Sequence, residues 1–211
     1  YNSIGYRTRI ITVEEIYSAM DGIDEQEKIR NQIIQEYQNN GISMVMLGGD
    51  VNIIPYRGFY CCVSEEYTDY DIPSDLYYSG LDGNWNSNGN DKWGEWFEAD
   101  MLPDVGVARL SFANEEEQAN IINKSLAYQR SPILGEFRDI TMGSEQMDDS
   151  PTYGGDYLEL IIGKCDENGY ATIGIPEDYN FTRIYAEHGN WSAENLTTAI
   201  NRGTQYIHHA G

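Results

Sequence analysis

Ile42-Ser43-Met44-Val45-Met46-Leu47-Gly48-Gly49-Asp50 is the stretch from which the fold can be read. Its nearly continuous apolar run is typical of a strand buried on both faces, as in parallel sheets. Gly48-Gly49-Asp50 then ends the strand at the carboxyl edge, where open α/β sheets place their ligands. The glycines match neither of the phosphate-binding patterns GxGxxG and GxxxxGK[ST], so we interpret this segment as a tight turn.

Strand and helix patterns alternate on both sides of this stretch. Thr12 caps a first helix, because Glu15 follows at capping-box spacing. Strands that alternate with helices imply crossover connections, so we predict an α/β fold with a mostly parallel sheet. The other expected strands are 9–13, 105–110, 139–143, 181–185 and 204–209, and the other expected helices are 24–38, 115–130, 156–168 and one that starts near residue 192.

A break at Ser131-Pro132-Ile133-Leu134-Gly135 separates two such series. The sequence therefore predicts an N-terminal α/β unit at 1–132 and the first part of a second unit at 133–211.

The composition narrows the classes of partner. The net charge is −22, from 35 acidic and 13 basic residues. Such a chain would be repelled by nucleic acid and by anionic membranes, so neither is expected as a partner. No apolar run approaches the roughly 20 residues that cross a bilayer, so no membrane insertion is expected. A strongly acidic surface suits a secreted protein, a cation binder or an enzyme with cationic substrates, and solubility alone also explains most of the excess.

The three cysteines carry little information. Cys61 and Cys62 are adjacent, which strains a disulfide between them, and Cys165 stands alone. Without a CxxC pattern they indicate neither a disulfide framework nor a zinc site, and we interpret them as buried structural thiols.

The sharpest local pattern runs from Asp82 to Glu95. Counted from Asn84 it reads N-x-N-x-N-G-x5-E, which is the spacing of an EF-hand loop. The pattern predicts a calcium site, although asparagines replace the usual aspartates and no flanking helix pair is visible. An Asn/Gly-rich surface loop held by Asx-turns is the alternative. The candidate ligands are Asn84, Asn86, Asn88, Asn90 and Glu95.

A second group of acidic residues follows the expected strand at 139–143. Glu145 comes just after this strand, where α/β enzymes keep polar catalytic groups. Asp148 and Asp149 lie in the loop beyond it, and Gly154-Gly155-Asp156 opens a helix. Asp156 could receive a basic side chain in a cleft, or it could serve only as a helix cap.

His208-His209 stands in the last expected strand. Adjacent strand residues point to opposite faces of the sheet, so the two imidazoles cannot serve one site. Each is interpreted as structural when taken alone.

An ordered series of motifs resembles the gingipain-type cysteine peptidases, family C25 of the caspase-like clan. The resemblance covers nearly the whole chain and continues from the helix at 115–130 through Glu145 and Asp156 to the last strand. Its motifs are Leu47-Gly48-Gly49-Asp50, Ile54-Pro55-Tyr56-Arg57, Asp71–Tyr78, Asp82–Glu95 and Pro103–Leu110.

The resemblance implies two caspase-like α/β units, with mostly parallel sheets flanked by helices, from a secreted cysteine endopeptidase. In this register Ala210-Gly211 matches the residues just before the family's catalytic histidine, so both members of the His/Cys dyad are expected beyond Gly211 and the chain alone is expected to be inactive. Glu145 matches the acid that orients that histidine. Asp156 matches the aspartate that receives arginine in arginine-specific members, although the preceding loop differs. The resemblance also implies a peptide or protein substrate, cleavage after Arg or Lys, and bound calcium.

Two other interpretations remain open at this point. The chain could be a non-catalytic, calcium-stabilised α/β binding module that has lost the dyad. Alternatively His209 could act as the base, which the register of the motifs disfavours.

Overall fold

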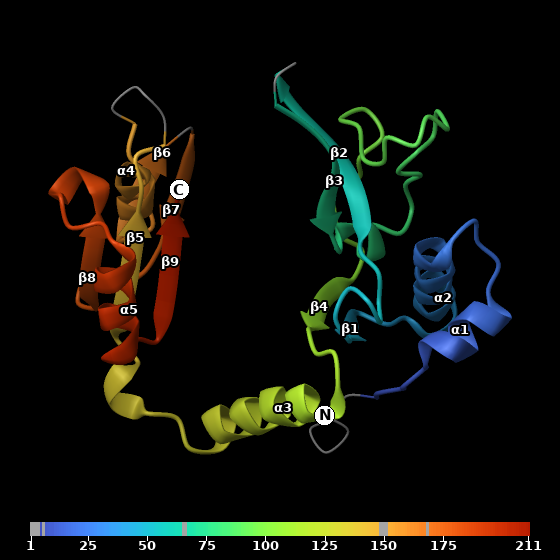
Figure 1. Cartoon of the computed structure of the whole chain (residues 1–211), viewed down its shortest axis with the longest axis horizontal. Helices are drawn as coiled ribbons and strands as arrows, with labels where there is room; N and C mark the ends of the chain where they lie inside the picture. The colour runs from blue at the N-terminus through green and yellow to red at the C-terminus, as the bar shows by residue number, and fades with distance from the viewer. Residues whose placement is uncertain (1–4, 6, 65–66, 148–151, 168) are drawn as a thin grey trace. The chain divides into compact units, whose positions relative to one another are not determined.

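The computed structural model describes residue 5 and residues 7–64, 67–147, 152–167 and 169–211 (Figure 1). It consists of two compact units, Tyr1–Leu126 and Ala127–Gly211. The division falls within α3 (Glu115–Arg130), whereas the sequence places it at 132/133. The α/β fold class is confirmed, because helices combine with mostly parallel sheets.

The first unit begins with two helices, and a side-chain cap marks the residue at which each of them starts. In α1 (Val13–Ala19) Thr12 and Glu15 form the predicted capping box. In α2 (Glu25–Asn40) the Asp24 carboxylate accepts from the Glu27 N–H, and Gly41 ends the helix in the left-handed conformation. Next come β1 (Met44–Gly48) and, much later in the chain, β4 (Gly106–Leu110), which pair in parallel.

Between these parallel strands the chain makes an antiparallel hairpin and a long loop. The hairpin consists of β2 (Arg57–Ser64) and β3 (Tyr67–Ser74), followed by the short helix η2 (Leu76–Tyr78). Tyr77, Tyr78 and Trp85 are almost fully buried and join the helices and β1 in one hydrophobic core. The loop after η2 is therefore anchored to the core by its aromatic residues.

The second unit is a three-stranded parallel sheet in the order β8-β5-β9. Figure 1 shows β5 between its two neighbours. Leu158 of α4 packs with Ile140 and Met142, and Leu196 of α5 lies against the opposite face, at Gly143. The helices thus cover both faces of the sheet. The bounds are η3 (Leu134–Glu136), β5 (Asp139–Ser144), α4 (Gly154–Glu159), β6 (Lys164–Glu167), β7 (Tyr170–Ile173), β8 (Asn180–Tyr185), η4 (Ala186–His188), α5 (Ala193–Asn201) and β9 (Tyr206–Ala210).

Three predictions about elements are wrong. Residues 9–12 form no strand, because within the described residues no strand lies alongside to pair with their backbone N–H and C=O groups. β1 is not buried on both faces, since Met44 and Met46 are 71% and 54% exposed. The helix expected over 156–168 ends at Glu159, and the antiparallel hairpin β6–β7 takes its second half.

The apolar residues of α3 are not covered. No residue of α3 is buried, and Ile122, Leu126 and Tyr128 are exposed. The interpretation of the cysteines as buried thiols is wrong, because Cys62 is exposed and Cys61 and Cys165 are only half-buried. No helix within the described residues has the length and apolar character needed to cross a bilayer.

Candidate functional site

The carboxyl edge of the β8-β5-β9 sheet brings together the ends of three strands. Ser144 of β5 is in register with Tyr185 of β8 and with Ala210 of β9. Glu145 follows β5 at this edge, as predicted. Its N–H donates to the Ala210 carbonyl at 3.0 Å, and its carbonyl accepts from the Gly154 N–H at 3.0 Å. The backbone of Glu145 is therefore held between β9 and α4.

The side chain of Glu145 lies across the end of β9. A Cβ atom added to Gly211 would stand only 2.9 Å from both Cβ and Cγ of Glu145, a distance that real side chains do not adopt. Gly211 therefore leaves the space that this side chain occupies. The Glu145 side chain is about half exposed, at 46%, so it remains accessible to a partner.

Asp156 lies in the first turn of α4 and is exposed. It is not the helix cap, because the N-cap position belongs to Tyr153, whose side chain makes no capping bond. The buried glycines before it allow α4 to approach the sheet: a Cβ on Gly154 would lie 2.9 Å from the Ala210 Cβ, and one on Gly155 would lie 2.9 Å from the Glu187 Cδ. Asp148 and Asp149 lie outside the described residues.

Glu187, in η4, is a group at this edge that the sequence analysis missed. Its Oε2 accepts from the hydroxyl of the fully buried Ser144 at 3.3 Å, and its carboxylate fills the space beside Gly155. Glu145, Asp156 and Glu187 come from three separate segments, and the edge that they share carries a concentration of negative charge. No spacing pattern links Glu187 to the other two, so only the sheet topology reveals it.

The two histidines of β9 have different surroundings. His209 stacks on Trp191 with ring centroids 5.2 Å apart and an angle of 12° between the planes, and its Nε2 lies 3.5 Å from Glu145 Oε1. His208 contacts Tyr206, whose hydroxyl lies 3.3 Å from its Nδ1. His209 therefore belongs to the carboxyl edge, and His208 does not contact Glu145.

The candidate calcium loop is closed by its own side chains. The Oδ1 atoms of Asn84, Asn86, Asn88 and Asn90 each accept backbone N–H groups farther along the loop at 2.9 to 3.1 Å. The side-chain amides of Asn88 and Asn90 donate to Glu95 Oε2, and these bonds lower the pKa of Glu95. The structure brings all five predicted ligands together, in the Asx-turns that the alternative interpretation also requires.

Other carboxylates near this loop are better suited to a cation. Oxygens of Asp82, Asp100 and Asp104 lie within 4.8 Å of one another. A hydrogen bond with Asp100 and the charge of that group raise the pKa of Asp82, which reflects their repulsion. Glu98 Oε2 accepts from the Ser87 N–H and hydroxyl, while its buried Oε1 has no hydrogen-bond partner. The three aspartates form an oxygen-rich donor set of the kind that calcium prefers.

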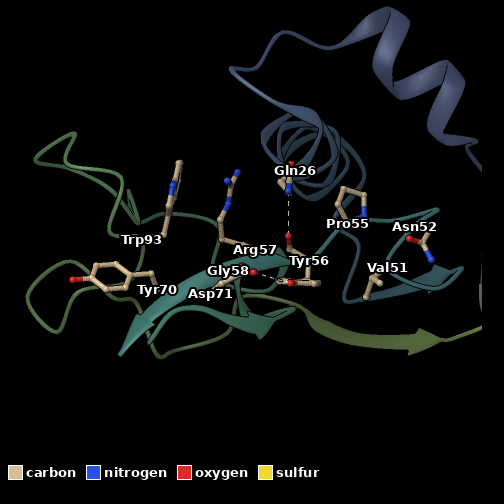
Figure 2. Close-up of a pocket in the computed structure, with 10 residues that line it drawn as sticks. All are labelled: Gln26, Val51, Asn52, Pro55, Tyr56, Arg57, Gly58, Tyr70, Asp71 and Trp93. Carbon is tan, nitrogen blue, oxygen red and sulfur yellow. Dashed lines mark hydrogen bonds between the residues drawn. The ribbon is translucent and has the colours of Figure 1, made fainter. Parts of the chain in front are cut away.

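A hollow of about 490 Å³ in the first unit contains none of the predicted site residues (Figure 2). Gln26 from α2 lies on one side and the β2–β3 hairpin on the other. Tyr56 is fixed there by a hydrogen bond from its hydroxyl to Asp71, which raises the pKa of Tyr56. The hollow is wide open, and the polar side chains that line it, such as those of Gln26 and Tyr56, form hydrogen bonds with other groups of the protein. It therefore gives no indication of a ligand.

Comparisons with known proteins agree with this architecture. A family model described as "Peptidase family C25" matches residues 1–211. A crystal structure of gingipain R, described as an Arg-specific cysteine proteinase, superimposes with a TM-score of 0.59 at 20% sequence identity. The superposition covers 98% of this chain and 41% of that one, so the present chain spans less than half of the known structure. No curated protein sequence gave a significant match.

Proposed function

The chain belongs to peptidase family C25, and on this basis we propose that it forms part of a secreted cysteine endopeptidase that hydrolyses peptide bonds after Arg or Lys. The observation that carries the proposal is the position of Glu145 at the carboxyl edge, with its side chain across Gly211. A residue that follows Gly211 would leave β9 beside this carboxylate. The acidic composition supports secretion, because such charge keeps an extracellular protein soluble.

In the proposed reaction a cysteine thiolate attacks the peptide carbonyl, and a histidine transfers protons as acid and base. We assign both reacting residues to positions beyond Gly211, from the register of the motifs. The contribution of this chain is to orient them. The Glu145 carboxylate would accept the histidine N–H, which fixes the tautomer and stabilises the imidazolium form.

Asp156 is proposed to bind the basic side chain of the substrate. Its carboxylate is exposed at the same edge as Glu145, and α4 is held there by the close approach of Gly154 and Gly155 to the sheet. A carboxylate binds guanidinium through charge-assisted bidentate hydrogen bonds and binds ammonium less specifically. Gingipain R is itself described as Arg-specific, which supports Arg as the preferred residue.

The test uses the protein extended beyond Gly211 and peptide substrates that differ only at the residue before the cleaved bond. We expect Asp156→Asn to reduce kcat/KM for arginyl substrates by at least about tenfold, since it removes one charged partner worth about 1.4 kcal/mol or more. A substrate with a neutral residue should be much less affected. Asp178→Asn, which alters an exposed carboxylate elsewhere in the second unit, is the matched control. Equal losses on both substrates would reject the specificity role.

The chain ending at Gly211 should show no thiol-dependent hydrolysis of these substrates. Turnover that alkylation abolishes would place the reacting residues within this chain and contradict the assignment. Absence of activity in the extended protein as well would instead favour a non-catalytic binding module.

Calcium is proposed as a structural ion near the loop from Asp82 to Asp104. Calorimetric titration of the metal-stripped chain should show calcium binding. Asp82→Asn and Glu95→Gln then separate the two donor sets, because the first changes the group of three aspartates and the second the EF-like loop. If the titration of the wild-type chain shows no heat of calcium binding, the calcium proposal is rejected. If both variants bind calcium as the wild type does, Asp82 and Glu95 are not ligands.

A further inference from the structure

His209 is held on one face of the sheet by its neighbours in register. It pairs with Gly143 of β5, and Met142 on the same strand pairs with His208. Because successive strand residues alternate between faces, His209 and Gly143 share the face covered by α5. His208 lies on the opposite face and serves as an internal comparison.

Trp191, just before α5, fixes the plane of the imidazole. Its ring is nearly parallel to that of His209, at 12°, with centroids 5.2 Å apart. This stacking depends on Gly143, since a Cβ there would stand 2.9 Å from the Trp191 Cζ3 atom. Because Gly143 has no side chain, the indole of Trp191 can lie across the sheet and stack on the imidazole of His209.

In this stacked position the imidazole of His209 has its Nε2 atom near the Glu145 carboxylate. His209 Nε2 lies 3.5 Å from Glu145 Oε1, and the Glu145 backbone is tied to Ala210, the residue after His209. Both side chains are nearly half exposed, at 43% and 46%. Pairs with this exposure contribute little to folding stability. The contact brings Nε2 of His209 to Oε1 of Glu145, which is the geometry that a positioning contact requires.

We propose that His209 is a positioning residue, which holds Oε1 of Glu145 and so leaves Oε2 aligned for a second donor. For catalysis the inference rests on the proposed function, in which that donor is the reacting histidine. The contact itself lies within the present chain and can be tested whether or not the protein is a peptidase.

The first test is made on this chain, labelled with ¹³C in the glutamate carboxylates and observed by NMR at neutral pH. Glu145→Gln identifies the Glu145 signal. His209→Phe keeps a ring on Trp191 but removes Nε2, whereas His209→Gln offers an amide Nε2 at a similar distance from the backbone. We expect the Glu145 signal to move clearly in the first variant, to stay near its wild-type position in the second, and to stay unchanged in His208→Phe. Equal positions in wild type and His209→Phe would overturn the proposal.

The second test uses the protein extended beyond Gly211. Loss of a positioning contact should lower kcat with little change in KM, by about one order of magnitude in His209→Phe. His209→Gln should recover most of the rate. If His209→Phe keeps the wild-type rate while His209→Gln loses it, the role of His209 is only to pack on Trp191, and the proposal fails. Equal losses in the two variants would also overturn it, because the amide of glutamine would then fail to replace Nε2. If the wild-type protein is inactive, the proposed function fails, while the NMR result still decides the contact.

Discussion

Asp24→Asn should destabilise the N-terminal unit through a single ion pair, because it keeps the helix cap and removes only the charge. Arg57 donates to both carboxylate oxygens of Asp24 at 2.8 Å, and Asp24 Oδ1 also accepts from the Glu27 N–H that opens α2. Asparagine caps helices about as well as aspartate does. The substitution therefore isolates the ion pair.

The burial of the two partners sets the magnitude. The Arg57 side chain is 7% exposed and stacks 3.8 Å from the centre of the Trp93 ring, so it cannot move into water when its partner is lost. Breaking a fully buried pair costs about 3–5 kcal/mol. The Asp24 side chain is 33% exposed, which moves the expected cost toward that of surface pairs, and we expect about 2–3 kcal/mol.

The same pair makes the stability depend on pH. Burial acts to raise the pKa of Asp24, but the hydrogen bonds from Arg57 and from the Glu27 N–H outweigh it and lower the pKa below its ordinary value. A carboxylate with a lowered folded pKa stabilises the fold above its unfolded pKa, about 3.9, and this contribution disappears as the pH falls through the folded value. Asp24→Asn should remove this part of the acid sensitivity, so wild type and variant should converge at low pH.

The assay is urea unfolding followed by tryptophan fluorescence in a Trp191→Phe background, so that the tryptophans of the first unit report. Arg9→Gln is the control, since Arg9 pairs with Glu36 in the same unit, its side chain is 68% exposed, and such a pair is worth less than about 1 kcal/mol. Asp24→Ala should cost about 1 kcal/mol more than Asp24→Asn, because it also removes the cap. Equal destabilisation by Asp24→Asn and Arg9→Gln would refute the reasoning.

Two further predictions concern local packing and capping. Gly155→Ala should destabilise the second unit by about 1–3 kcal/mol through its clashes with Glu187 and with the buried ring of Tyr185, and Glu187→Ala should relieve only part of that loss when thermal unfolding is followed at Trp191. Thr12→Ala should cost about 1 kcal/mol and Thr12→Ser much less in denaturant unfolding, since only serine preserves the bond to the Glu15 N–H; equal losses in the two variants would contradict the capping role.

Elements with strong local signals were predictable from the sequence. Helix α3 has the predicted bounds, and the capping box of Thr12 and Glu15 forms as expected. Such features depend on residues within one turn of each other. The hairpin β6–β7 was missed because Leu160, Ile161 and Ile162 continue the helical apolar pattern. Gly163, with φ 66°, directs the chain into the hairpin.

The candidate site was predictable only in part, for a similar reason. Glu145 follows a recognisable strand, and the motif series indicated its location. Strand order brings Glu187 and Trp191 to the carboxyl edge of the second unit, and folding of the loop brings Asp82, Asp100 and Asp104 together in the first unit. No spacing in the sequence carries that information. The solvent exposure of Met44 could not be predicted from the sequence either, because an apolar strand does not indicate which of its faces a neighbouring element covers.

The glycines at the carboxyl edge have a consequence for mutational tolerance. At Gly143, Gly154, Gly155 and Gly211 even a methyl group would stand within about 3 Å of a neighbouring heavy atom. Saturation mutagenesis should therefore find these positions intolerant of every replacement, alanine included, although Gly211 is itself exposed. A survey that ranks positions by hydrophobicity or charge would overlook them. In a mutational map made without any structure, the positions that accept only glycine would include this edge, together with other close approaches such as those at Gly58 and Gly174.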